Sequence, residues 1–97
     1  MAVYIDPLAR GPRSHKWPWK LSCHLFADTP EELHEFAERV GLSRGWFQSA
    51  AGQMPHYDLT KAMRRKAIAG GAVQVTRRRA VKLWWGKLNW QRRTATV

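Results

Sequence analysis

The sequence predicts a small single-domain α/β sandwich, a short mixed sheet with about three helices in the order β-β-α-β-α-β-α. Three observations predict this class. The chain has 97 residues, the size of one domain. Residues 21–27 alternate like a strand, and an amphipathic helix follows them directly. Short apolar runs then alternate with helical segments. We expect one domain over 1–83 and a basic, Trp-containing C-terminal tail over 84–97.

The first strands follow from short apolar runs. Residues 2–5 (AVYI) suit a short buried strand, which an Asp-Pro pair ends. Residues 7–16 carry two prolines and a glycine and predict an exposed loop. Residues 21–27 (LSCHLFA) predict a second strand, in which alternation separates Cys23 from His24.

The clearest helix is predicted within residues 28–42 (DTPEELHEFAERVGL). Asp28 or Thr29 can cap it, and Pro30 suits its first turn. Gly41 suits its end. The residues that form its apolar stripe are Leu33, Phe36, Ala37 and Val40.

The remaining elements are shorter. Asp58 or Thr60 can cap a second helix, and Thr76 can cap a third. In chain order we expect a strand at 46–48, a helix at about 60–69, a strand at 72–76 and a helix at 77–85.

The positive charge lies in the C-terminal part of the chain. Residues 1–59 hold six Lys/Arg and seven Asp/Glu, a balance of −1, whereas residues 60–97 hold eleven Lys/Arg and no acid, a balance of +11. Such asymmetry predicts a polyanionic partner, either nucleic acid, DNA or RNA, or an anionic membrane surface. An acidic protein is a further possible partner.

Basic side chains can neutralise phosphates, and tryptophans can stack on bases. The candidate nucleic-acid-binding residues are Lys61, Arg64, Arg65, Arg77, Arg78, Arg79, Lys82, Trp84, Trp85, Lys87, Trp90, Arg92 and Arg93.

Residues 55–60 (PHYDLT) support two interpretations. In an extended segment His56 and Asp58 point to one side, and Tyr57 and Leu59 to the other. The polar pair suits a His–carboxylate pair or a shared metal ion. Alternatively Asp58 caps the following helix and His56 packs beside it.

A second polar pair strengthens the chemical interpretation. His24 lies near the end of its strand, and Asp28 begins the next helix. If His24, Asp28, His56 and Asp58 converge, they form a candidate divalent-metal site for phosphate-ester hydrolysis, with His24, His56 and Asp58 as candidate catalytic residues. No close-spaced ligand pair such as HxxxH or CxxC supports a structural zinc site.

Cys23 is the only cysteine, so no internal disulfide is possible. It shares its predicted strand face with leucines, which indicates a core thiol. The chain lacks a signal-peptide pattern and an apolar run long enough to span a membrane. We expect a cytoplasmic protein.

Several rare-residue segments resemble one known family. The segments CHLFAD, ELHEFA, WFQ, PHYDLT and GAVQVTRR, in this order, are similar to small bacterial and phage proteins catalogued as domain of unknown function four-zero-three-one. The resemblance covers about residues 2–79 and implies no activity. The loop at 7–16 and the tail from about 84 depart from the family pattern. The resemblance marks these polar and aromatic residues: His24, Asp28, His34, Trp46, Gln48, His56, Tyr57 and Asp58.

The leading functional hypothesis is therefore a small basic bacterial or phage protein that binds nucleic acid through its C-terminal third. A metal-assisted phosphoesterase or nuclease is the alternative from a different class. Given the resemblance, a phage protein that binds and inhibits an acidic host protein is a further alternative. Convergence of the His and Asp side chains in one site separates the first two, because a binding protein needs only the basic surface.

Overall fold

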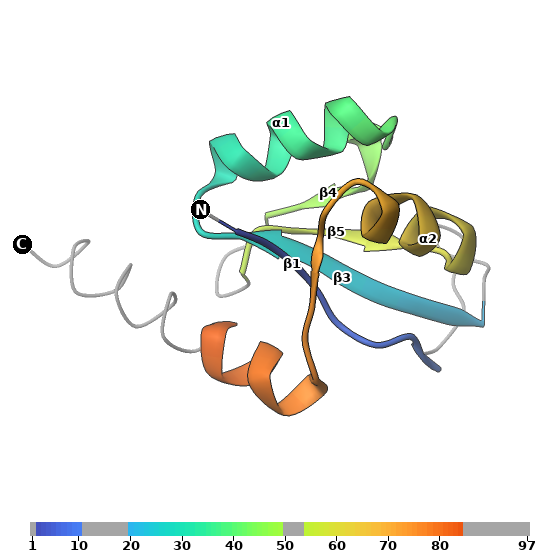
Figure 1. The fold of residues 1–97 in the computed structure, drawn as a ribbon, viewed down its shortest axis with the longest axis vertical. Coiled ribbons are helices and arrows are strands. Elements are labelled where there is room, and N and C mark those ends of the chain that lie inside the picture. The colour runs from blue at the N-terminus through green and yellow to red at the C-terminus, as the bar shows by residue number, and fades with distance from the viewer. Residues whose placement is uncertain (1, 11–19, 50–53, 85–97) are drawn as a thin grey trace, which may run out of the picture.

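The computed structural model describes residues 2–10, 20–49 and 54–84, which form a mixed sheet covered by helices (Figure 1). The strands pair in the order β4-β5-β3-β1-β6, and β2 pairs separately with β3. In chain order the elements are β1 (Val3–Ile5), β2 (Ala9–Arg10), β3 (Leu21–Ala27), α1 (Pro30–Val40), the 3-10 turn η1 (Arg44–Trp46), β4 (Phe47–Gln48), β5 (His56–Leu59), α2 (Lys61–Ala69), β6 (Val73–Gln74) and a helical segment at 77–84.

The sheet is mixed because it contains both antiparallel and parallel strand pairs. β1 pairs antiparallel with β3, and β3 pairs antiparallel with β5. β6 pairs in parallel with β1, which requires the crossover that α1, β5 and α2 occupy in the chain. The predicted fold class is confirmed.

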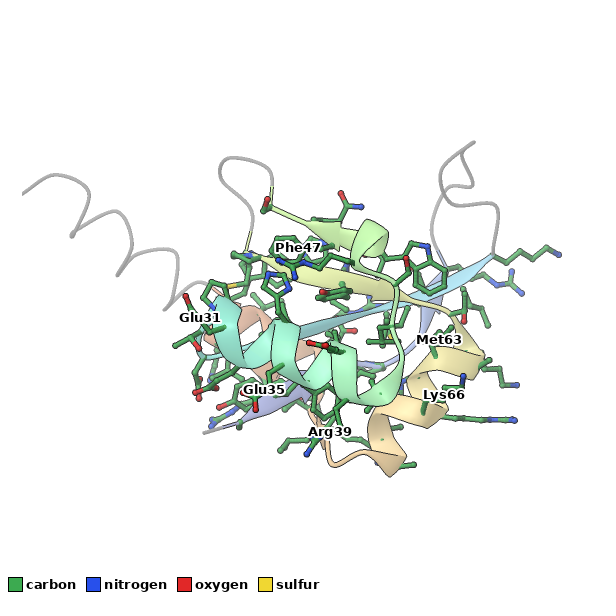
Figure 2. The ribbon with its side chains drawn as sticks, turned by 90° about the horizontal axis from the view of Figure 1, so that it is seen from above. Glu31, Glu35, Arg39, Phe47, Met63 and Lys66 are labelled. Atoms are coloured by element: carbon green, nitrogen blue, oxygen red, sulfur yellow. The ribbon has the colours of Figure 1, made fainter. Side chains whose placement is uncertain are left out.

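One face of the sheet packs against α1 and α2 (Figure 1). Leu33 and Phe36 from α1 and Ala67 from α2 meet the inward side chains of the central strands. Figure 2 shows the two helices side by side over the sheet, with exposed Glu35 on α1 and exposed Lys66 on α2. This layer holds the larger hydrophobic core.

The opposite face carries a smaller cluster and the helical segment 77–84 (Figure 1). Phe26 on β3, Met54 and Ala80 are its buried members. Trp84 is half-buried and packs against this cluster. His24 lies on the same face, and its side chain is partly exposed beside this cluster.

Side-chain caps define the helix starts. Thr29 caps α1, with its hydroxyl accepting from the Glu32 amide, and Gly41 ends α1 at φ 82°. Thr60 caps α2 and accepts from the Met63 amide. The hypothesis that Asp58 caps this helix is wrong, because Asp58 lies inside a strand and its side chain faces the sheet surface.

The observed strands differ from the predicted ones in number and in length. Residues 56–59 form an additional strand, β5, between the third predicted strand and the second helix. The strand expected at 46–48 is shortened by η1, and the one expected at 72–76 is reduced to Val73–Gln74. Part of the expected loop at 7–16 pairs with β3 as β2; its remainder lies outside the described residues.

Within the described residues, no helix is long and apolar enough to cross a membrane.

Candidate metal centre

Three adjacent strands place polar side chains in a row across one sheet face. His24 on β3 is the direct cross-strand partner of Asp58 on β5. Asp6 follows β1 and lies on the other side of His24, where its backbone amide donates to the His24 carbonyl at 3.2 Å. The row Asp6–His24–Asp58 therefore follows from strand register alone.

Alternation explains why this row is polar. Ile5, Leu25 and Leu59 are fully buried against α1 and α2. Their chain neighbours Asp6, His24 and Asp58 must point to the other face. His56 precedes Asp58 by two residues and shares that face, whereas Tyr57 is buried on the opposite side.

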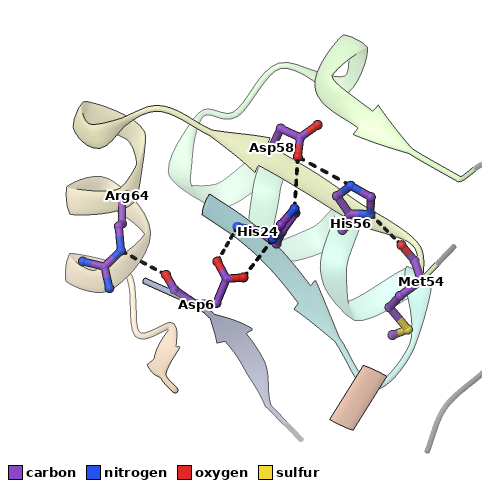
Figure 3. Close-up of polar contacts among 6 residues, drawn as sticks. All are labelled: Asp6, His24, Met54, His56, Asp58 and Arg64. Carbon is purple, nitrogen blue, oxygen red and sulfur yellow. Dashed lines mark hydrogen bonds and ion pairs between the residues drawn. The ribbon is translucent and has the colours of Figure 1, made fainter. Parts of the chain in front are cut away.

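Asp6 holds the His24 imidazole (Figure 3). Its Oδ2 lies 2.8 Å from His24 Nδ1, and its Oδ1 accepts from the His24 backbone amide at 2.6 Å. A carboxylate only accepts hydrogen bonds, so Nδ1 is the protonated nitrogen. In neutral His24 the lone pair is therefore on Nε2, which points toward Asp58 (Figure 3).

A backbone carbonyl holds His56 in the same tautomer. Met54 O lies 2.6 Å from His56 Nδ1, and a carbonyl oxygen also only accepts. The lone pair of neutral His56 is again on Nε2, which faces Asp58 Oδ1 at 3.5 Å (Figure 3). When they are neutral, both imidazoles thus present an unprotonated nitrogen toward one carboxylate oxygen.

These three donor atoms converge. His24 Nε2 lies 3.8 Å from Asp58 Oδ1, and one possible ligand atom from each of the three residues lies within 4.8 Å of the others. Ligand atoms of a tetrahedral ion with bonds of about 2.0–2.2 Å are roughly 3.3–3.6 Å apart. The 3.5 Å separation of His56 Nε2 from Asp58 Oδ1 falls in this range, and the 3.8 Å separation of His24 Nε2 lies slightly above it; neither is the distance of a good hydrogen bond.

The centre opens to solvent on one side. The His24 side chain is 42% exposed, whereas that of His56 is 7% exposed. Trp84 forms a wall beside both rings, with centroid distances of 5.6 Å to His24 and 5.2 Å to His56. A ligand would therefore approach from the His24 side.

The electrostatics favour a cation. The hydrogen bond to Asp6 raises the pKa of His24 above its ordinary value, burial opposes this shift, and the charges of Asp6 and Asp58 add to it. The positive charge of Arg77 acts in the other direction. Two carboxylates therefore attract positive charge at this point, either a proton on His24 or a metal ion.

The family model described as "Protein of unknown function (DUF4031)" matches residues 3–86. The chain belongs to this family. No curated protein and no solved structure matches the chain. The resemblance expected from the sequence is confirmed, and the match to DUF4031 spans every residue of the row and of the converging group.

One expected ligand does not join the group. The Asp28 carboxylate lies beside β1, where it accepts from the Ala2 amide at 3.2 Å and from the Tyr4 hydroxyl at 3.4 Å. Among the described residues the converging group is His24, His56 and Asp58. The prediction of four converging ligands is therefore wrong for Asp28.

Asp6 was missed by sequence reasoning, which assigned the Asp-Pro pair only to a strand end. A signal was present in the alternation of AVYID, which places Tyr4 and Asp6 on one side and Ile5 on the other. Using that signal requires the register between β1 and β3, which pairs Ile5 with Leu25. The carbonyl of Met54 has no sequence signal.

The polar residues marked by the resemblance divide between two faces. His34 on α1 lies on the side opposite the centre, where its Nδ1 is 2.9 Å from the Tyr57 hydroxyl and its ring packs on Phe47. Trp46 packs against the larger core, and Gln48 is exposed on β4. Cys23 is a buried free thiol whose pKa is raised to about 12 by burial, so it is not a nucleophile at neutral pH.

The candidate nucleic-acid-binding residues also divide between two layers. Lys61, Arg64 and Arg65 are on α2, across the sheet from the centre. Arg77–Arg79 and Lys82 are in the helical segment 77–84 on the side of the centre, and Trp84 contacts it. The candidates outside the described residues are Trp85, Lys87, Trp90, Arg92 and Arg93.

Proposed function

We propose that this protein is a divalent-metal-dependent hydrolase of phosphate esters in nucleic acids or nucleotides. The observation that carries the proposal is the convergence of His24, His56 and Asp58, which offer ligand atoms within 4.8 Å of one another, with both Nε2 atoms facing Asp58 Oδ1 at 3.8 and 3.5 Å. Both histidines are fixed in the tautomer that leaves Nε2 free to coordinate.

The donor set suits a catalytic ion. Two imidazoles and one carboxylate favour zinc or a manganese-like ion over magnesium, which prefers oxygen ligands and bound water. His24, His56 and Asp58 would hold the ion with three ligands, and a zinc ion held in this way would supply an activated water by lowering the pKa of that water. The exposed side of His24 gives a substrate access to the centre.

The surrounding charge favours an anionic substrate. Arg77 is close enough to His24 to lower its pKa, and Arg78, Arg79 and Lys82 follow in the same helical segment. Guanidinium groups bind phosphate oxygens in a planar, two-bond arrangement. A phosphate ester is therefore the substrate class that the neighbourhood supports.

Metal binding is the first test. Isothermal titration with Zn²⁺ and with Mn²⁺ should give one site per chain in the parent protein and a large loss of affinity in His24→Asn and Asp58→Asn. His34→Asn is the matched control, because His34 lies on the opposite side of the sheet. Hydrolysis of bis(p-nitrophenyl) phosphate should likewise be lost in His24→Asn and Asp58→Asn and retained in His34→Asn. A parent protein that binds neither ion contradicts the proposal.

A second candidate function is nucleic-acid binding through the basic segment that begins at 77. Seven Lys/Arg side chains of residues 60–84 are exposed, and no acid follows Asp58 in the chain. With about four phosphate contacts, log affinity should fall against log salt with a slope of about −3 to −4.

Charge-matched variants test this surface. Changing Arg77, Arg78 and Arg79 together to Gln should weaken binding to single-stranded DNA and RNA and reduce the slope. The control changes Lys61, Arg65 and Lys66 to Gln, which removes the same charge from α2 across the sheet. Equal losses in both variants would show non-specific attraction and contradict a defined surface. No affinity at low salt in the parent contradicts nucleic-acid binding itself.

A further inference from the structure

We infer that Asp6 is a positioning residue of the metal centre, which orients His24 for coordination and tightens metal binding. This inference rests on the proposed centre and adds a residue that does not itself touch the ion. It is carried by two hydrogen bonds from one carboxylate to one histidine, at 2.8 Å to the ring and 2.6 Å to the backbone amide.

The two bonds fix the ring relative to its own backbone. Oδ1 of Asp6 binds the His24 amide while Oδ2 binds Nδ1, so the carboxylate bridges the main chain and the side chain of one residue (Figure 3). This arrangement selects the Nδ1–H tautomer and restricts ring rotation. Nε2 is thereby aimed at Asp58 Oδ1, the oxygen that His56 also faces.

Asp6 is itself held in place. Its backbone amide donates to the His24 carbonyl, and its backbone carbonyl accepts from Arg64 Nε at 3.2 Å. Its side chain is only 14% exposed. A carboxylate anchored at both main-chain groups can impose an orientation on His24 with little loss of its own freedom.

The two histidines are held by acceptors of different charge. His56 donates to a neutral carbonyl, whereas His24 donates to a carboxylate, which makes its imidazole a stronger electron-pair donor. With neutral imidazoles, Asp6 and Asp58 give the group a charge of −2, which a divalent ion balances. Removal of the Asp6 charge should therefore weaken the centre even where the ring stays in place.

The test compares Asp6→Asn with the parent protein by competition titration of Zn²⁺ against a chelator dye. Asp6→Asn should keep one site per chain and bind about 10–100-fold more weakly. Asp28→Asn is the matched control, because Asp28 also accepts a backbone amide but lies outside the group. It should bind like the parent. Circular dichroism of each variant confirms folding before titration.

A metal-free measurement separates the inference from the proposed function. At a pH high enough for His24 to be neutral, ¹⁵N–¹H spectra of histidine rings should show His24 as the Nδ1–H tautomer in the parent and a mixture in Asp6→Asn, with His56 unchanged. If Asp6→Asn binds Zn²⁺ like the parent, Asp6 is not a positioning residue, although the centre stands. If the parent binds no metal, the proposed function fails, and with it any positioning role toward a metal. An unchanged His24 tautomer in the variant overturns control of the ring by Asp6 in either case.

Discussion

At the scale of single residues, β5 separates two kinds of chemistry by alternation. His56 and Asp58 face the candidate metal centre, and Tyr57 between them is buried against α1. Tyr57 needs a partner for its hydroxyl, and His34 Nδ1 supplies it at 2.9 Å. One four-residue strand therefore provides two candidate ligands and one anchored core residue.

The His34–Tyr57 pair makes stability depend on pH. Burial, together with the positive charge of Arg44, lowers the pKa of His34 below its ordinary value of 6.5. The unfolded chain therefore binds this proton more readily than the folded one. The contribution of neutral His34 is complete above the unfolded pKa and is lost as the pH falls toward the folded pKa.

We expect His34→Gln to lose less stability than the parent between about pH 7.5 and pH 5.5, because glutamine does not titrate. Its amide oxygen can still accept from the Tyr57 hydroxyl, so the packing is retained. Urea unfolding of both proteins at the two pH values measures the difference. A larger loss in the variant would mean that protonated His34 stabilises the fold.

At the scale of secondary-structure elements, the boundary between β5 and α2 is set by Thr60. Its hydroxyl accepts from the Met63 amide at 3.3 Å, one of the amides that a helix start leaves without a partner. Thr60→Ala should lower the free energy of unfolding by about 1 kcal/mol. In metal-free protein Asp58→Asn should leave the cap intact. Thermal unfolding in the presence of a chelator compares the stability of the two variants. A larger loss of stability in Asp58→Asn than in Thr60→Ala would contradict Thr60 as the residue that caps α2.

Elements with strong local signals were predicted well, and those that depend on pairing were not. α1 has a cap, an apolar stripe and a terminal glycine within one segment, and the structure has all three. β2 has two residues in a segment expected to be a loop, and its strand geometry comes from pairing with β3. Such pairing is a tertiary contact, which no local pattern reports.

The residues of the candidate site also divide into those that a local pattern predicts and those that depend on strand pairing. Alternation in PHYDL predicts that His56 and Asp58 share a face, and the structure places them so. The contribution of Asp6 depends on the register of β1 with β3, and that of Met54 on a backbone carbonyl. Asp28 was expected because it follows the strand that carries His24, yet it faces Tyr4. Sequence proximity was a weaker guide here than strand register.

At the scale of the whole molecule, the two faces of the sheet differ in what they carry: one face packs the larger hydrophobic core, and the other carries the candidate metal centre. The face under α1 and α2 buries most of the large apolar side chains, including Phe36, Leu25 and Tyr57. The other face has a small cluster around Phe26 beside the polar row. A domain of 97 residues has a modest core, so an ion that links three side chains from two strands should contribute measurably to stability.

Zinc should therefore raise the melting temperature of the parent protein. A ligand at one hundred times its dissociation constant, bound only by the folded state, stabilises by about 2.7 kcal/mol. For a domain of this size that corresponds to an increase of about 10 °C or more. The increase should disappear in Asp58→Asn and remain in His34→Gln, and Mg²⁺ should have little effect because it prefers oxygen ligands. Differential scanning calorimetry at several Zn²⁺ concentrations measures it. An unchanged melting temperature in the parent over the whole range of Zn²⁺ concentrations would show that the converging side chains hold no ion in the folded state.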